Sequence, residues 1–144
     1  MNDDPFNLDR FVRAQENDYE RALDEVRSGR KRSHWMWYIF PQCAGLGHSA
    51  ISQHYAIKSL DEARAYLAHP VLGPRLTECA EAVMSVNQRS AHEIFGSPDD
   101  MKLKSSATLF ALVSPHDSVF HRIIEKYFEG ADERTLGLMQ GSRL

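Results

Sequence analysis

Apolar residues recur at helical spacing along most of the chain, and the clearest example follows Pro74. Leu76, Cys79, Ala80, Val83 and Met84 stand at i, i+3, i+4, i+7 and i+8, which is the pattern of one buried helix face. The same spacing leaves Arg75, Glu78 and Glu81 mostly on the other side. The pattern predicts a helix with Pro74 at its first position. We expect residues 71–86 to supply a buried face and not a binding surface.

Start and stop signals divide the rest of the chain into further helices. Capping-box spacings begin at Asn17, Ser59 and Ser90, and Gly29 stands where a glycine commonly ends a helix. The signals and apolar stripes predict helices around residues 8–12, from 17 to 29, over 60–68, from 90 to 95, from Pro98 to about Val113, from Ser114-Pro115 through Phe128, and a short one capped by Asp132.

The segment Trp35 to Phe40 is harder to assign. A run of six apolar residues closed by Pro41 fits either a buried strand or a short buried helix, and we favour the helix. The fold predicted from these patterns is mainly α: a single compact multi-helical domain over residues 1–144, with its core from about residue 8 to residue 139.

Composition narrows the class of protein. The 144 residues are 42% hydrophobic and 26% charged, which fits one globular domain. A formal charge of −3 gives no general attraction to nucleic acid, so we expect no nucleic-acid partner. Near the aromatic segment lies a local basic cluster, which is either a solvated surface or a phosphate contact: Arg27, Arg30, Lys31 and Arg32.

Other features of the sequence speak against disulfides, membrane spans and metal sites. Cys43 and Cys79 lack the spacing of a disulfide framework or a metal site, which is typical of reduced thiols in a cytoplasmic protein. The longest apolar run is too short for a membrane span and the first residues do not resemble a signal peptide. The seven histidines form no HExxH motif. We therefore expect no membrane association, no bound metal and no cofactor.

The segment from His34 to Ser49 is the strongest candidate for function. It holds both tryptophans of the chain, and such aromatic density either anchors a core or lines a pocket for a flat ligand. At least one tryptophan is expected to be core. Two glycines, Gly45 and Gly47, either expose backbone N–H groups to an anion or form a tight turn. The candidate ligand-binding residues of this segment and just beyond it are His34, Trp35, Trp37, Gln42, Gly45, Gly47, Ser49 and Tyr55.

A second group of polar residues lies within the helix predicted after Pro98. Lys102 and Ser106 share a face at i, i+4, and Ser105 and Thr108 lie close by. Hydroxyl groups on a core-facing helix either contact a ligand or bond back to the preceding turn. We add Lys102 and Ser106 to the candidate ligand-binding residues, with Lys102 as the nearest countercharge to a phosphate.

Two functions from different classes fit these residues. The first is a small-molecule site for a nucleotide or ADP-ribose-like compound, in which a phosphorylated ligand meets the glycine loop and its ring stacks on an aromatic side chain. Whether such a site is catalytic stays open. The second is a noncatalytic helical domain whose exposed aromatics dock a protein partner.

Several longer strings resemble a known family. HWMWYIFPQ, GLGHS, EARAYLAHPVLGPRL, EIFGSPDDMKLKSSATLF and DERTLGLM are similar to the bacterial family called domain of unknown function 1810, sometimes labelled calpastatin. The resemblance runs from about Leu8 to Met139 and implies a compact, mainly helical domain without an established activity. Calpastatin-type inhibition is associated with disordered repeats, whereas this composition is globular.

A second resemblance concerns the order of short elements. Ser52 to Tyr55, Lys58, Pro70, the Arg75-Leu76 pair and the closing Leu136 to Met139 follow an order similar to that of the NADAR proteins, N-glycosidases that act on ADP-ribose derivatives. That family has a glutamate where Gln53 stands. A glutamine cannot exchange a proton as a carboxylate does, so the departure removes the general base that the resemblance implies.

Overall fold

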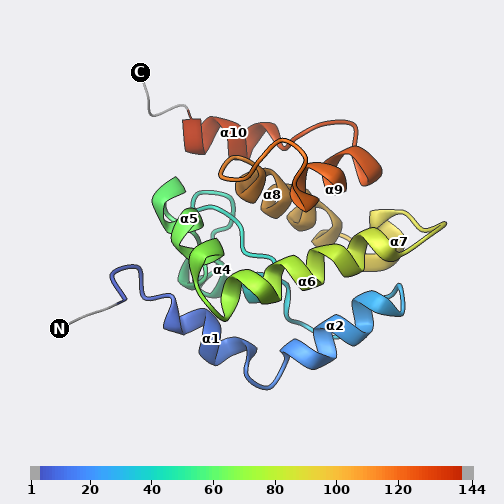
Figure 1. Ribbon diagram of the computed structural model, residues 1–144, viewed down its shortest axis with the longest axis horizontal. Coiled ribbons are helices and arrows are strands. Elements are labelled where there is room, and N and C mark those ends of the chain that lie inside the picture. Colours follow the sequence, from blue (N-terminus) through green and yellow to red (C-terminus); the bar gives the residue numbers. More distant parts are fainter. Residues whose placement is uncertain (1–3, 141–144) are drawn as a thin grey trace.

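Helices make up nearly all of the regular structure in the computed structural model, which describes residues 4–140 (Figure 1). Within that range there is no strand, and one isolated parallel bridge joins Cys43 to Ile57. The mainly α prediction is therefore confirmed. The ten helices of the described residues are α1 (Asp9–Gln15), α2 (Tyr19–Arg27), α3 (Met36–Ile39), α4 (Ala50–His54), α5 (Leu60–Ala68), α6 (Leu72–Ser85), α7 (Ala91–Phe95), α8 (Asp99–Ala111), α9 (Val119–Tyr127) and α10 (Glu133–Gln140).

Helix α6 organises the packing. It crosses the middle of the molecule with α1 and α2 on one side and α8, α9 and α10 on the other (Figure 1), and it contacts α2, α5 and α9. Leu76, Ala80 and Val83 are at most 2% exposed, whereas Glu78 and Glu81 are exposed. The predicted buried face is confirmed, and it belongs to one continuous hydrophobic core.

Most of the predicted helix starts are also present. Ser59 and Ser90 accept hydrogen bonds from the backbone N–H groups of Glu62 and Glu93, each at 3.0 Å, and Asp132 accepts one from the Thr135 N–H at 3.0 Å. Gly29, with φ +82°, ends α2 in the left-handed conformation that favours glycine. Local capping chemistry therefore fixes where these helices begin and end.

Three predicted boundaries near prolines are wrong. Helix α6 begins at Leu72, two residues before Pro74, because the His69 ring accepts hydrogen bonds from the N–H groups of Val71 and Leu72 at 3.1 and 3.2 Å. Helix α9 begins at Val119 and not at Pro115, because Ser118 provides its cap. Helix α8 begins at Asp99 and ends at Ala111. A proline is tolerated throughout the first helical turn, so it marks a start less sharply than a cap does.

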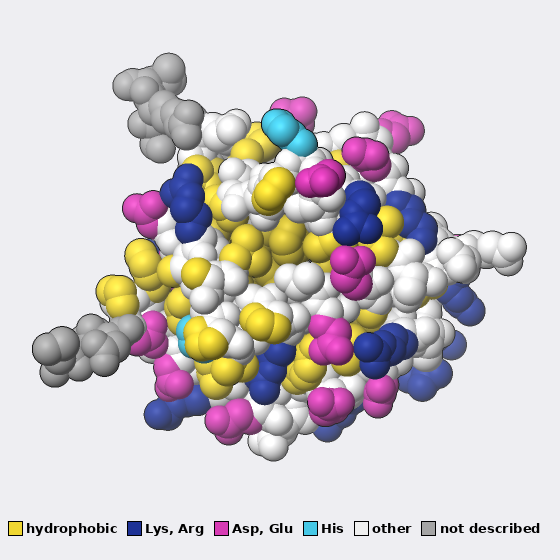
Figure 2. Space-filling view, in the orientation of Figure 1, with side chains coloured by type: hydrophobic (Ala, Val, Ile, Leu, Met, Phe, Trp, Pro, Cys, Tyr) yellow, Lys and Arg dark blue, Asp and Glu magenta, His cyan; other side chains and the backbone are white. Residues whose placement is uncertain are grey.

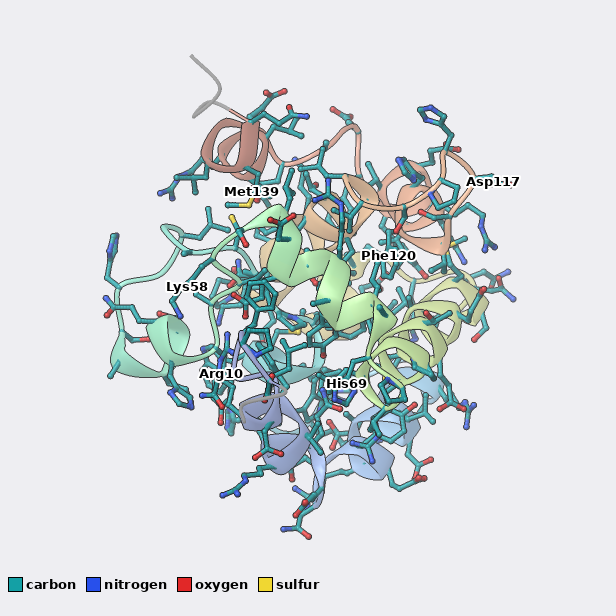
Figure 3. The ribbon with its side chains drawn as sticks, turned by 60° about the vertical axis from the view of Figure 1, so that its left-hand side comes forward. Arg10, Lys58, His69, Asp117, Phe120 and Met139 are labelled. Carbon is teal, nitrogen blue, oxygen red and sulfur yellow. The ribbon has the colours of Figure 1, made fainter. Side chains whose placement is uncertain are left out.

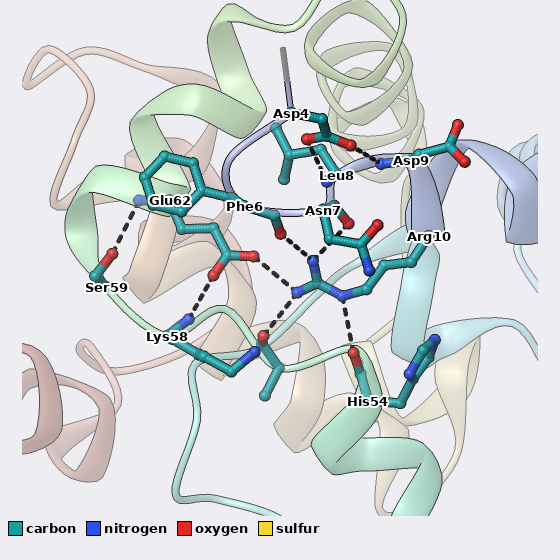
Figure 4. A network of polar contacts seen from close by, with 11 residues as sticks. Asp4, Phe6, Asn7, Leu8, Asp9, Arg10, His54, Lys58, Ser59 and Glu62 are labelled. Atoms are coloured by element: carbon teal, nitrogen blue, oxygen red, sulfur yellow. Dashed lines mark hydrogen bonds and ion pairs between the residues drawn. The ribbon is translucent and has the colours of Figure 1, made fainter. Parts of the chain in front are cut away.

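A buried ion pair fixes the segment that joins α4 to α5. The Arg10 guanidinium donates to Glu62 Oε2 at 2.7 Å, to the carbonyls of His54 and Ala56 at 2.8 and 2.9 Å, and to two carbonyls of its own turn (Figure 4). Glu62 Oε1 accepts from the Lys58 N–H at 3.0 Å. Arg10 and Lys58 are on the same side of the molecule in the side-chain view (Figure 3). The bonds from Arg10 to the His54 and Ala56 carbonyls tie this segment to α1, and the bond from the Lys58 N–H to Glu62 ties it to α5.

Charge on the surface is mixed. Acidic and basic side chains are interspersed on the face shown in Figure 2, with hydrophobic groups between them. Among residues 4–140 there is no helix with the length and apolar character needed to cross a membrane.

Candidate functional site

The two tryptophans of the aromatic segment have different surroundings. Trp35 is fully buried, its ring packs against Phe40 and Phe95 at centroid distances of 6.3 and 6.4 Å, and its indole N–H donates to Glu25 Oε1 at 3.0 Å. The segment itself forms the short helix α3, as expected. Trp35 is therefore a core residue, which confirms that at least one tryptophan is core.

Trp37, two residues further on, is only partly buried. It lines three hollows in the surface, and the Lys102 ammonium lies 5.0 Å from its ring centroid. Lys102 in turn contacts Asp99 Oδ1 at 3.3 Å. A cation at that distance is attracted to the face of an indole ring. The contact brings the two sequence-predicted groups, the aromatic segment and α8, to one place.

The first hollow is small and mostly apolar, with a volume of about 180 Å³. Trp37 and Tyr55 contribute aromatic rings to it, and Gln42 and Gln53 contribute amides. Gly45 and Gly47 also line it, so the glycine loop forms part of its wall. Lys58, an exposed residue, also lines this hollow.

The second hollow is larger, about 540 Å³, and more polar. It shares Trp37, Gln42, Gly47 and Ser52 with the first hollow. Its other lining residues come from the glycine loop, from α8 and from α10: Leu46, His48, Ser49, Pro98, Met101, Lys102, Ser105, Asp132 and Arg134. Arg134 donates to the Gly45 carbonyl at 3.3 Å, which connects α10 to the loop.

The two glycines have different structural roles. Gly45 has φ +100° and therefore forms the tight turn that was one of the two expectations. Gly47 does not need a positive φ; a Cβ there would lie 2.6 Å from Ser52 Oγ, so the close approach of α4 requires a glycine. Ser49 caps α4 by accepting from the Ser52 N–H at 3.2 Å. Its oxygen is thus engaged within the loop.

Seven of the ten predicted ligand-binding residues line the two hollows: Trp37, Gln42, Gly45, Gly47, Ser49, Tyr55 and Lys102. Trp35 and Ser106 do not, because they are 0% and 1% exposed within the core. Ser106 is covered because α8 is surrounded by α5, α7, α9 and α10, which leaves no polar face beyond its first turns. His34 lines a third hollow, separated from the second by Trp37 and Pro98.

Sequence reasoning missed other residues of the site. Arg134, Asp132 and Ser105 line the second hollow, and Gln53 and Lys58 line the first. Arg134 lies 89 positions beyond Gly45, and only the packing of α10 on α8 brings it to the loop. The back-bonding expected of α8 hydroxyls is present for Ser105 and Thr108, which donate to carbonyls four residues earlier at 3.1 and 2.8 Å.

The carboxylate of Asp132 in the second hollow has structural partners, and the two thiols of the chain are buried. Asp132 Oδ2 accepts from the Thr135 hydroxyl at 2.6 Å and from Ser105 Oγ at 3.3 Å. Cys43 and Cys79 are free and buried, and burial raises the pKa of both thiols, that of Cys79 to about 12. Within residues 4–140 there is no group of three His, Cys, Asp or Glu side chains placed to hold a metal ion.

The third hollow is built on the loop that precedes Trp35. Glu25, which is 7% exposed, accepts from the N–H groups of Arg32 and Ser33 at 2.7 and 2.9 Å and from Ser33 Oγ at 2.6 Å. With the Trp35 indole, the carboxylate receives four hydrogen bonds. Burial acts to raise the pKa of Glu25, but these hydrogen bonds outweigh it and hold the pKa below its ordinary value of 4.5.

We expect the stabilising effect of Glu25 to depend on pH. Because its pKa is lower in the folded state, its contribution is fully present above the unfolded pKa near 4.5 and is lost as the pH falls through the folded value. The free energy of unfolding of Glu25→Gln, measured in urea, should therefore lie about 2–3 kcal/mol below that of the parent at pH 7. The difference should narrow below pH 4; a constant difference from pH 7 to pH 3 would contradict this role.

Comparison with known proteins places the whole chain in one group. A family model described as "Protein of unknown function (DUF1810)" matches residues 5–139. The crystal structure of the conserved hypothetical protein Rv1873 from Mycobacterium tuberculosis is similar, with 52% sequence identity, a TM-score of 0.92, and coverage of 94% of this chain and 98% of that chain. No curated protein matches the sequence. The fold and the length are shared with that relative.

Proposed function

Because this chain belongs to DUF1810, a family of unknown function, we infer its function from the site itself: it binds a phosphorylated small molecule with a flat ring, of the nucleotide or ADP-ribose class. One observation carries the proposal. Trp37 is the shared wall of a mostly apolar hollow and of a larger hollow with two cations, Lys102 and Arg134. A nucleotide has the same two parts, a ring and a phosphate, next to each other.

The ring is assigned to the first hollow. Trp37 and Tyr55 provide aromatic surfaces there, and flat rings stack favourably on such surfaces. Gln42 and Gln53 carry amides that offer both donors and acceptors, as the edge of a base or a ribose requires. Its volume of about 180 Å³ suits one ring system rather than a whole nucleotide.

The phosphate is assigned to the second hollow. Lys102 and Arg134 reach it from different helices, and Arg134 forms no ion pair with a described residue. Charge-assisted hydrogen bonds from such groups are the usual means of holding a phosphate. Its volume of about 540 Å³ lies within the range of ligand pockets, roughly 300–1,000 Å³.

The shape of this surface favours a ligand over a docked protein. Concave hollows with converging polar groups are typical of small-molecule sites, whereas docking surfaces are flat and apolar. The large hydrophobic residues that are most exposed in the described chain, Ile51, Met101 and Leu138, come from three different helices and are 40–49% exposed. We therefore prefer the binding site to the interaction domain.

The proposal concerns binding and includes no reaction. The first hollow has no carboxylate in its lining, and Gln53 lies there in the position where the NADAR resemblance calls for a glutamate. Asp132, in the second hollow, is engaged by Thr135 and Ser105. A glycosidase needs a carboxylic acid or carboxylate that is free to act.

The test measures the binding of AMP, GMP and ADP-ribose by calorimetry and by tryptophan fluorescence. The chain has two tryptophans, and since Trp35 is buried, a change in emission reports on Trp37. We expect one of these compounds to bind and to change the emission, and we expect the Trp37→Phe variant to bind it without a change in emission.

Lys102→Ala should lower the affinity by about ten- to a hundredfold, because one hydrogen bond to a charged group is worth about 1.5–3 kcal/mol.

Lys104→Ala is the matched control. Lys104 lies on the same helix two residues further on, and it lines neither hollow. We expect this variant to bind as the parent does. An absence of binding by all three compounds at millimolar concentration would overturn the proposal, and so would equal losses of affinity in the Lys102 and Lys104 variants.

A further inference from the structure

The third hollow lies beside the proposed site and is not used by it. Its volume is about 350 Å³, and Trp37 and Pro98 line both this hollow and the second one. Arg32 and His34 line it from the loop before α3, and Ser97 lines it from the loop before α8. The third hollow therefore extends the surface around Trp37 beyond the proposed phosphate position in the second hollow. Its lining includes side chains with hydrogen-bond donors.

The charges in this hollow do not balance one another. Asp99 contacts Lys31 Nζ at 2.9 Å and Lys102 Nζ at 3.3 Å, so two ammonium groups neutralise this carboxylate. Arg32 is exposed and forms no ion pair with any residue in the described part of the chain. The residues that line the hollow thus carry an excess of positive charge, and its guanidinium has no carboxylate partner among residues 4–140.

The loop that carries Arg32 is held in place. Glu25 binds the N–H groups of Arg32 and Ser33, and the Lys31 N–H donates to the Ile94 carbonyl at 2.7 Å. The Lys31 side chain is only 8% exposed and lies 5.1 Å from the centre of the Trp35 ring. The backbone that carries Arg32 and His34 is therefore held from two sides, which is part of the preorganisation that an anion site requires.

We propose that the ligand carries a second phosphate, separate from the first, which Arg32 and His34 bind in the third hollow. The proposal rests on the proposed function, because it places the first phosphate at Lys102 and Arg134. The second and third hollows share Trp37 and Pro98 in their linings, so this assignment makes the two phosphates neighbours. Nucleoside 3′,5′-bisphosphates have this arrangement, with two phosphates on one ribose, whereas a nucleoside diphosphate has both in one chain.

The experiment compares AMP and GMP with adenosine and guanosine 3′,5′-bisphosphate, on the full chain, by calorimetry. We expect the bisphosphate to bind about tenfold or more tightly than its monophosphate. Arg32→Ala should remove that advantage and leave the affinity for the monophosphate unchanged. Arg30→Ala is the matched control. Arg30 is also exposed, lies on the same loop, lines none of the three hollows and forms no ion pair with a residue between positions 4 and 140.

The outcomes separate this inference from the proposed function. If the monophosphate binds and the bisphosphate binds no more tightly, the second phosphate site is wrong and the proposed function stands. Equal losses in the Arg30 and Arg32 variants would show a diffuse effect of charge and would also overturn the inference. If none of these four nucleotides binds, the inference fails, and the proposed function fails with it when ADP-ribose does not bind either. Circular dichroism and the melting temperature of each variant establish that it is folded.

Discussion

Trp35→Ala should lower the free energy of unfolding by about 3–5 kcal/mol, a large part of the roughly 5–15 kcal/mol that holds a domain of this kind together. The side chain is fully buried and packs on Phe40 and Phe95, so its removal leaves a cavity. It also leaves Glu25 with one hydrogen bond fewer. Urea unfolding followed by circular dichroism measures the change without relying on tryptophan emission.

Trp37→Ala is the variant to compare with Trp35→Ala. Trp37 lies in the four-residue helix α3, and Trp35 is the N-cap residue of the same helix. Trp37 is partly exposed and lines hollows on the surface, so its removal forms no closed cavity and should cost much less than the loss of Trp35. If the two alanine variants unfold at the same urea concentration, the division of the segment into a core tryptophan and a site tryptophan is incorrect.

The different surroundings of Trp35 and Trp37 show how much of the candidate site could be predicted from the sequence. The aromatic density of residues 34–49 indicated the segment that lines the hollows, but nothing in the sequence around Trp35 and Trp37 shows which of the two rings is enclosed. Helical geometry places residues two apart on different faces. Only the packing of α7 and Glu25 against one side determines that Trp35 is enclosed and Trp37 is open.

The fold was predictable for a different reason. Helix signals are local: an apolar stripe such as that of α6, or a cap such as Ser90 with Glu93, lies within one or two turns of the chain. Long-range polar contacts leave no such signal. Glu62 has the spacing of a capping-box residue after Ser59, yet its side chain bonds to the Lys58 N–H and to Arg10, 52 positions away.

The same limit applies to the cations of the site. Lys102 stood out because it interrupts an apolar helix, whereas Arg134 lies in an ordinary polar stretch of α10. Arg134 reaches the Gly45 carbonyl because α10 packs against α8. Residues that join a site through tertiary packing have no periodicity or spacing that identifies them beforehand.

The buried pair of Arg10 and Glu62 gives the second large effect. Arg10→Met should lower the free energy of unfolding by about 3–5 kcal/mol, because it leaves Glu62, 2% exposed, as a buried charge without its partner. The double variant Arg10→Met/Glu62→Leu removes both charges. It should recover part of the loss but remain below the parent, since the carbonyls of His54 and Ala56 still lose their donor. Urea unfolding of Arg10→Met, of Glu62→Leu and of the double variant, each compared with the parent, measures the coupling between the two residues.

Arg13→Met on the same helix is the control for a change of arginine to methionine. Arg13 pairs with Asp9 at 2.6 Å, but the two side chains are 79% and 52% exposed, and such surface pairs contribute about 0–1 kcal/mol. If the free energies of unfolding of Arg10→Met and Arg13→Met differ by less than about 1 kcal/mol, the stabilising role of the buried Arg10–Glu62 pair is contradicted. Because Arg10 fixes the segment that carries Tyr55 and Lys58, a folded Arg10 variant should also bind the nucleotide more weakly, although Arg10 does not line the two hollows around Trp37.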